Sequence, residues 1–201
     1  MDSPVDTGKS KLIVLASGSL YRKRLLKRLV EEFEVAAHHI DESAIANESP
    51  RNLAGRLAQA KAKALVGRYP DRWIIGSDQV AVRDRVRLSK PGNYEEAFKQ
   101  LRDSSGKSVI FFTSVCIVGP GGKKIRTETD VCRVYFRTLT EEQITGYLKR
   151  EQPFDCAASL KSEGLGIALV EKIEGHDPSA LIGLPLILLS KMMEEFGLEV
   201  F

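Results

Sequence analysis

A turn of small residues followed by a basic segment could bind phosphate near the start of the chain. Ser17 opens a Ser-Gly-Ser turn after an apolar run, and Arg22, Lys23 and Arg24 follow about one helical turn later. Small residues at the end of a strand leave backbone N–H groups open to an anion at a helix N-terminus. The sequence therefore predicts a phosphate-binding turn, with an ordinary solvent-exposed basic helix face as the alternative.

Acidic side chains in two other places could hold a divalent cation or activate water. Asp78 lies inside the apolar segment Ile-Ile-Gly-Ser-Asp-Gln-Val at 74–80, where an unpaired carboxylate would be costly to bury. It is a candidate Mg²⁺ ligand or general base, and a structural Asp at a β-turn is the alternative. Asp41 and Glu42 form a second acidic pair after an expected strand, with exposed loop charge as the alternative.

Two further residues could contact the two ends of a nucleotide. Lys90 precedes a stiff proline between an expected strand and an expected helix, where its ammonium group could contact phosphate. Glu163 lies in the small-residue loop Lys-Ser-Glu-Gly at 161–164, where the edge of a base could approach. For each of these residues, ordinary surface charge is the alternative.

Alternating strands and helices are expected to position these residues. The apolar run at 11–16 predicts a short buried strand, and residues 20–30 predict a helix with Ser19 as its N-cap. Further strands are expected at 73–82, 108–118, 125–137 and 166–173, and further helices at 50–66, 93–102, 140–149 and 185–196. Because Pro-Gly-Gly at 120–122 predicts a turn between two long strands, we expect an α/β fold with a mixed sheet.

The composition is that of an ordinary globular protein. The 201 residues are 43% hydrophobic and carry a formal net charge of +3, which is too small to indicate nucleic-acid binding. No apolar stretch is long enough to cross a bilayer, and the first ten residues lack the apolar core of a signal peptide. The three cysteines have no paired spacing and are interpreted as small buried apolar residues. We expect a cytoplasmic protein with a flexible tail at 1–10 and one domain at 11–201.

The order of these motifs resembles the Maf family over about residues 11–197. The match includes LIVLASGSLYRKR at 12–24, Asp-Glu-Ser at 41–43, Gly-Ser-Asp-Gln at 76–79, Lys-Pro at 90–91, and the closing segments at 156–169 and 175–186. The resemblance implies a mixed sheet flanked by helices in two lobes around an active-site cleft, similar to inosine-triphosphate pyrophosphatases. It also implies a homodimer and hydrolysis of nucleoside triphosphates between the α- and β-phosphates with Mg²⁺ or Mn²⁺.

Residue roles follow from the same resemblance, position by position. Asp78 matches the family's catalytic acid, and Glu42 matches the acidic residue that accompanies it at the divalent metal. The expected phosphate-binding residues are Ser17, Arg22, Lys23, Lys61 and Lys90.

A smaller set of positions bears on the base. Gln79 and Glu163 resemble the branch of the family that hydrolyses 7-methyl-GTP, whereas the dTTP/UTP branch typically has Ala-Asp-Thr at the first site and a glutamine at the second. A carboxylate can accept both donors of the guanine edge. An aromatic face, here Tyr21, favours the positive charge that N7 methylation gives the base. Departures such as Ala158, where a Gly is typical, bear on the preferred base more than on the reaction.

We therefore expect a nucleotide diphosphatase, a hydrolase that converts 7-methyl-GTP to 7-methyl-GMP and diphosphate with the help of a divalent cation. No membrane contact is expected. Two alternatives stay open at this point. One is the same reaction on dTTP or UTP. The other is a nucleotide-sensing regulator of cell division that binds nucleic acid through the basic helix at 22–28.

Overall fold

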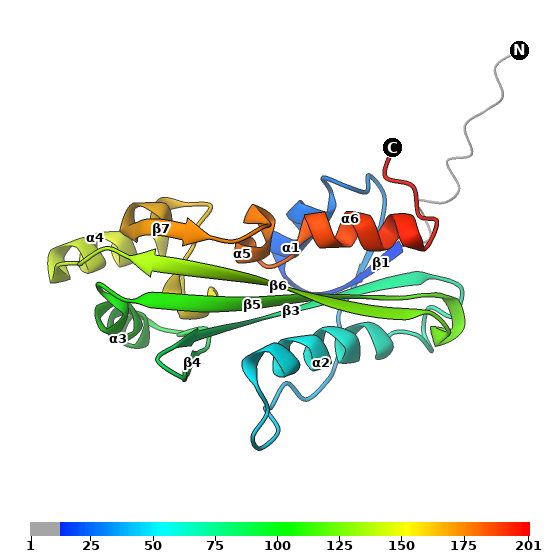
Figure 1. The fold of residues 1–201 in the computed structure, drawn as a ribbon, viewed down its shortest axis with the longest axis horizontal. Coiled ribbons are helices and arrows are strands. Elements are labelled where there is room, and N and C mark those ends of the chain that lie inside the picture. The colour runs from blue at the N-terminus through cyan, green and yellow to red at the C-terminus, as the bar shows by residue number, and fades with distance from the viewer. Residues whose placement is uncertain (1–12) are drawn as a thin grey trace, which may run out of the picture.

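A mixed β-sheet forms the centre of the protein (Figure 1), and the computed structural model describes residues 13–201. Its strand order is β2-β1-β3-β5-β6-β7, with β4 paired to β3. Only β1 pairs in parallel, with β2 and β3, and the other pairs are antiparallel. The expected mixed sheet is thus confirmed, and the tail expected at 1–10 lies outside the described residues. The strands are β1 (Ile13–Ala16), β2 (Glu34–Ala36), β3 (Trp73–Arg83), β4 (Val86–Leu88), β5 (Ser108–Val118), β6 (Ile125–Phe136) and β7 (Val170–Glu174).

Most helices begin where the sequence supplies a capping side chain. Ser19, Ser49 and Asn93 each accept a hydrogen bond from a backbone N–H of the first helical turn, and Thr140 forms a capping box with Gln143. No helix in the described part is long and apolar enough to cross a membrane. The helices are α1 (Leu20–Leu26), α2 (Pro50–Lys63), α3 (Tyr94–Ser104), α4 (Glu141–Glu151), α5 (Pro178–Ile182) and α6 (Leu186–Glu195).

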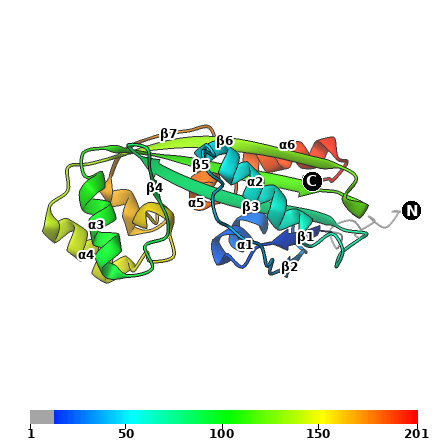
Figure 2. The ribbon, with the colours of Figure 1, turned by 90° about the horizontal axis from the view of Figure 1, so that it is seen from below.

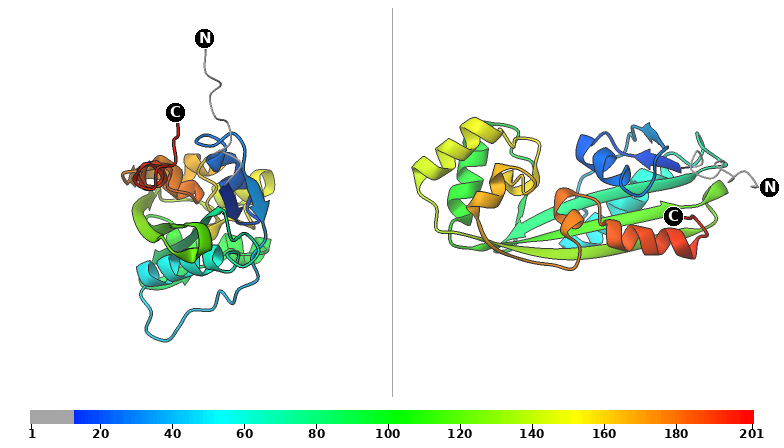
Figure 3. Two further views of the ribbon diagram at one scale, coloured as in Figure 1. Left: turned by 90° about the vertical axis from the view of Figure 1, so that its right-hand side faces the viewer. Right: turned by 90° about the horizontal axis from the view of Figure 1, so that it is seen from above.

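The helices pack at two ends of the sheet and so form two lobes (Figures 2 and 3). In the first lobe, α3 and α4 enclose a core that includes Leu101, Phe111 and Leu148. In the second lobe, α1 and α6 cover one face of β1 and β3, and α2 covers the opposite face. The long strands β3, β5 and β6 run through both lobes, so the two lobes meet over the middle of β3.

The segment expected as a strand at 166–173 is shorter than predicted. Residues Leu165–Leu169 form a 3₁₀ helix, and β7 begins only at Val170. Gly166 accounts for the difference, because its N–H donates to the carbonyl oxygen of Lys161 and a Cβ would lie 2.5 Å from that oxygen. The chain therefore folds back on itself here, and an apolar run cannot distinguish such a turn from a strand.

Helix α2 lies directly against β3 at Gly76. A Cβ on Gly76 would be 2.2 Å from the carbonyl oxygen of Ala58 and 2.8 Å from the nitrogen of Ala62. Ala58 and Ala62 are fully buried at this contact. Because no side chain separates the two backbones, the residues that follow Ala58 on α2 lie close to the middle of β3.

Substituting Gly76→Ala should therefore lower the free energy of unfolding by about 2 kcal/mol or more, because the added methyl group overlaps backbone atoms of α2. Gly146→Ala is the matched control, because Gly146 lies inside α4 with nothing within 4 Å of its Cβ position. The control should raise the stability by about 0.5–1 kcal/mol. Urea unfolding measures both variants, and a Gly76→Ala midpoint equal to that of the wild type would contradict the close contact.

Candidate active site

A cleft of about 900 Å³ opens between the two lobes and is lined by both of them. This volume suits a ligand of nucleotide size. Lys23 is not among the lining residues, whereas Arg24, which is also exposed on α1, lines the cleft. Asp41 does not line it either, and nine candidates from the sequence do: Ser17, Tyr21, Arg22, Glu42, Lys61, Asp78, Gln79, Lys90 and Glu163.

The turn after β1 is closed by its own side chains. The hydroxyl of Ser17 accepts a hydrogen bond from the N–H of Ser19 at 3.1 Å, and the hydroxyl of Ser19 accepts one from the N–H of Arg22 at 3.4 Å. Arg22 Nε donates to the carbonyl oxygen of Gly183 at 2.8 Å, which ties α1 to the end of α5. Burial lowers the pKa of the Arg22 guanidinium, while the nearby carboxylates of Asp78 and Glu42 act in the opposite direction. The turn therefore presents to the cleft a half-buried cation that is held by a hydrogen bond.

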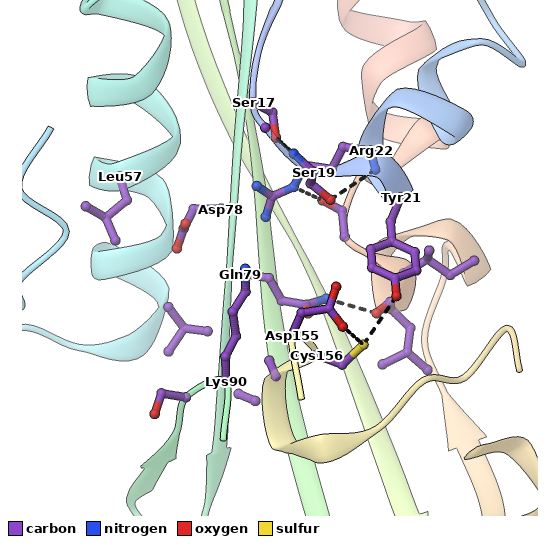
Figure 4. A pocket seen from close by; sticks show the side chains of 18 of the residues that line it. Ser17, Ser19, Tyr21, Arg22, Leu57, Asp78, Gln79, Lys90, Asp155 and Cys156 are labelled. Atoms are coloured by element: carbon purple, nitrogen blue, oxygen red, sulfur yellow. Dashed lines mark hydrogen bonds between the residues drawn. The ribbon is translucent and has the colours of Figure 1, made fainter. Parts of the chain in front are cut away.

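A buried ion pair joins α2 to β3. Figure 4 shows its Asp78 side chain across the cleft from Arg22. Lys61 Nζ lies 2.6 Å from Asp78 Oδ1 and 3.2 Å from Glu42 Oε1. Lys61 is 4% exposed and Asp78 is 7% exposed, whereas the Glu42 side chain is 52% exposed. Asp78 lies in the middle of β3, so it is not a β-turn residue. Its burial is matched by a cation, as a buried carboxylate requires.

The two carboxylates suit a cation that is shared with a substrate. The described residues contain no group of three or more His, Cys, Asp or Glu side chains that could hold a metal ion. Mg²⁺ is commonly held by one or two carboxylates, with water and substrate phosphates as the remaining ligands. Glu42 and Asp78 both contact Lys61 and come from different elements, so they fit such a partial ligand set.

The end of the cleft farther from Asp78 is lined by an aromatic ring, a thiol and two carboxylates. Tyr21 and Cys156 meet there, with the Cys156 thiol 3.9 Å from the Tyr21 hydroxyl and 3.5 Å from Asp155 Oδ1. Asp155 and Glu163 are both exposed at this end. Burial, with the Asp155 carboxylate as a second cause, raises the pKa of the Cys156 thiol to about 12. Burial also raises the pKa of Tyr21, with Cys156 contributing. Both groups are therefore neutral beside two carboxylates.

Gln79 presents only part of its amide to the cleft. Its Nε2 lies 3.0 Å from Thr113 Oγ1 and 3.0 Å from the carbonyl oxygens of Ala180 and Leu181. The amide nitrogen is therefore used by the protein, and the amide oxygen is the atom left for a ligand. In this position Gln79 also links β3 to α5.

The loop that carries Glu163 is held by an ion pair from α4. Glu151 Oε1 lies 2.6 Å from Lys161 Nζ, and Glu151 Oε2 accepts the N–H of Leu165 at 2.6 Å. Gly164 is packed against the same carboxylate, because a Cβ there would lie 2.7 Å from it. These contacts fix the residues on both sides of Glu163.

Several cleft residues were not singled out from the sequence. His38, Asp155 and Cys156 line the cleft, and the interpretation of Cys156 as a buried apolar residue is wrong because it is only half-buried. Burial lowers the pKa of His38, with the Lys61 cation as the second cause, and its Nδ1 is buried without a hydrogen-bond partner in the described part. No spacing signal marks these residues, because each lies in or beside a loop that only the fold brings to the cleft.

Comparison with known proteins places this site in a family. The family described as Maf-like protein matches residues 12–196. The chain is 47% identical over 188 residues to a 7-methyl-GTP pyrophosphatase of Nitrosococcus oceani, covering 94% of both chains. It is 48% identical over 188 residues to a 7-methyl-GTP pyrophosphatase of Pseudomonas aeruginosa, covering 94% of this chain and 98% of that one. The Ham1 protein of Staphylococcus aureus matches 63% of this chain and 72% of its own with a TM-score of 0.40 and 15% identity, which is too low to bear on this chain.

The high pKa of Cys156 predicts an unreactive thiol in spite of its place in an open cleft. At pH 8 iodoacetamide should label Cys156 at least about tenfold more slowly than free cysteine, because only the thiolate reacts. The labelling rate should still be rising at pH 10, and Asp155→Asn should increase it by removing the second cause of the shift. Mass spectrometry of the labelled peptide gives the rates. Labelling as fast as free cysteine would contradict this description of the cleft.

Proposed function

The chain belongs to the Maf-like protein family, and from that premise we propose that it is a nucleoside triphosphate pyrophosphatase that converts 7-methyl-GTP to 7-methyl-GMP and diphosphate. The observation that carries the proposal is the buried pair of Lys61 and Asp78 beside a basic turn in a cleft of nucleotide size. The names of the relatives point to the same reaction.

In the proposed reaction Asp78 orients and deprotonates the water that attacks the α-phosphorus. Its Oδ1 accepts a hydrogen bond from Lys61, so Oδ2 is the oxygen for that water. Arg22, Lys61 and Lys90 offset the negative charge that builds up on the departing diphosphate. The turn at Ser17 supplies backbone N–H groups to the phosphates.

The same two carboxylates would hold the divalent cation. Glu42 and Asp78 are the residues for Mg²⁺ or Mn²⁺, and a bound ion would neutralise phosphate charge and increase the electrophilicity of phosphorus. Without a ligand, the Lys61 ammonium balances these carboxylates. Its four-carbon stem is flexible enough to exchange a carboxylate for a phosphate oxygen.

The opposite end of the cleft is suited to a cationic purine. Glu163 would accept the two adjacent donors of the guanine edge, and Tyr21 would lie against the charged ring. The exposed carboxylate of Asp155 adds negative charge at this end. Asp155 and Glu163 thus place two exposed carboxylates where a 7-methylated base would bind. The homodimer implied by the family resemblance and the cytoplasmic location expected from the composition belong to this proposal as well.

Diphosphate release with Mg²⁺ from 7-methyl-GTP, GTP, dTTP and UTP tests the proposed substrate. The largest kcat/KM is expected for 7-methyl-GTP. A preference for a pyrimidine would keep the reaction and overturn the base assignment. Absence of release from all four nucleotides would favour a nucleotide sensor instead.

Asp78→Asn should reduce kcat by about two orders of magnitude or more, because the amide cannot accept the proton of the attacking water. The fold should be retained, since Asn keeps the shape of the side chain. Asp84→Asn is the matched control, because Asp84 is exposed and pairs with Lys107 on the surface. Turnover of the Asp78 variant close to that of the control would remove Asp78 from the reaction.

Glu163→Gln should lower kcat/KM for 7-methyl-GTP at least about tenfold, because it replaces a charged acceptor of two donors by an amide. The value for UTP should stay the same or rise, because the amide supplies the donor that the uracil edge also requires. Steady-state kinetics on both nucleotides measure the effect, with Glu171→Gln on β7 as the control. Equal losses on both nucleotides would show that Glu163 does not read the base.

A further inference from the structure

The loop between β2 and α2, residues 37–49, brings Glu42 to the cleft. It contains neither helix nor strand, and the Glu42 side chain is half-exposed. A half-exposed carboxylate on an irregular loop needs external contacts to hold one position, because ordering a long side chain costs conformational entropy. Lys61 on α2 contacts the carboxylate directly, and a second side chain of the same helix holds the loop.

Arg56 binds this loop at two points. Its Nε lies 2.7 Å from Glu48 Oε1 and its Nη2 lies 2.8 Å from Glu48 Oε2, so the ion pair is bidentate. The same Nη2 donates to the carbonyl oxygen of Ser43 at 2.9 Å. Glu48 in turn accepts the N–H of Ile45 at 3.2 Å, and its side chain is 9% exposed. We call Arg56, Glu48 and the Ser43 carbonyl the Arg56 clamp.

The clamp lies directly beside Glu42 in the chain. Ser43, which follows Glu42, is held through its carbonyl by Arg56 and through its N–H by Asp41 Oδ1 at 2.9 Å. Helix α2 carries both Arg56 and Lys61, which are about 7.5 Å apart along the helix axis. One rigid helix therefore positions the Lys61 ammonium and the backbone next to Glu42.

We propose that Arg56 is a positioning residue that holds the Glu42 carboxylate against Lys61 and Asp78 through the Arg56 clamp. The inference rests on the proposed function, in which Glu42 acts at the phosphate and cation end of the cleft. Arginine suits this role better than lysine, because its planar guanidinium donates to both oxygens of Glu48 and to a carbonyl oxygen in a fixed geometry. A surface ion pair without this role would contribute little beyond about 1 kcal/mol of stability.

A double-mutant cycle between Arg56→Lys and Glu42→Gln tests the coupling. Arg56→Lys alone should raise the Mg²⁺ concentration for half-maximal release of diphosphate from 7-methyl-GTP about tenfold, with kcat at saturating Mg²⁺ within about threefold of the wild type. In the Glu42→Gln background the same change should have less than about a twofold further effect. Equal effects of Arg56→Lys in both backgrounds would overturn the proposal. Full activity of Glu42→Gln would also overturn it.

Two controls separate positioning from simple stability. Arg51→Lys changes an exposed arginine of the same helix outside the clamp and should leave the Mg²⁺ dependence unchanged. Glu48→Gln removes the other side of the ion pair and should reproduce the Mg²⁺ dependence of Arg56→Lys. A normal Mg²⁺ dependence in Glu48→Gln would contradict the clamp even if Arg56→Lys failed to fold.

Amide hydrogen exchange gives a result that does not depend on activity. In the wild type the amides of Ser43 and Ile45 should be protected, and Arg56→Lys should speed their exchange at least about tenfold while leaving α2 unchanged. Unchanged exchange at these amides would overturn the proposal even in an active enzyme. If the wild type hydrolysed none of the four nucleotides, the proposed function would fail while faster exchange in the variant would still support the clamp.

Discussion

The ion pair between Lys61 and Asp78 constrains the arrangement of the elements around the cleft. Two opposite charges that are almost fully buried are tolerable only as a pair with good geometry, and removing either partner would leave an uncompensated charge in the interior. The pair forms because α2 lies against β3 without an intervening side chain at Gly76. Glu42 joins the pair from a loop and Arg22 faces it across the cleft, so the whole site is organised around one short ion pair.

Two loops depend on a similar device at opposite ends of the cleft. Arg56 and Glu48 hold the loop that carries Glu42, and Glu151 and Lys161 hold the loop that carries Glu163. In both cases a helix supplies one partner of the ion pair. The same helix side chain also forms a hydrogen bond with the backbone of the loop. Irregular segments thus acquire fixed positions without a regular pattern of backbone hydrogen bonds. These contacts keep the loops that carry Glu42 and Glu163 in place at the cleft.

The sequence predicted the sheet, the long helices and nine of the residues that line the cleft, because those features leave local signals. Apolar runs and caps such as Ser19 and Thr140 mark elements, and Asp78 is conspicuous inside an apolar strand. Features that depend on distant partners gave no signal. The 3₁₀ turn at Gly166 requires the backbone of Lys161, and the five residues of α5 are too few to show a period. The hydrogen bonds from the Gln79 amide nitrogen to α5 could not be predicted from the sequence either.

The continuity of β3, β5 and β6 through both lobes has a mechanical consequence. The two sides of the cleft are parts of one hydrogen-bonded sheet rather than two bodies joined by a linker. Closing the cleft around a ligand would require three adjacent strands to bend together. A hydrogen-bonded sheet resists such bending much more than a peptide hinge does. The enzyme therefore has a cleft of nearly fixed width. Its selectivity among ligands then depends on how well their shape and charge fit that cleft.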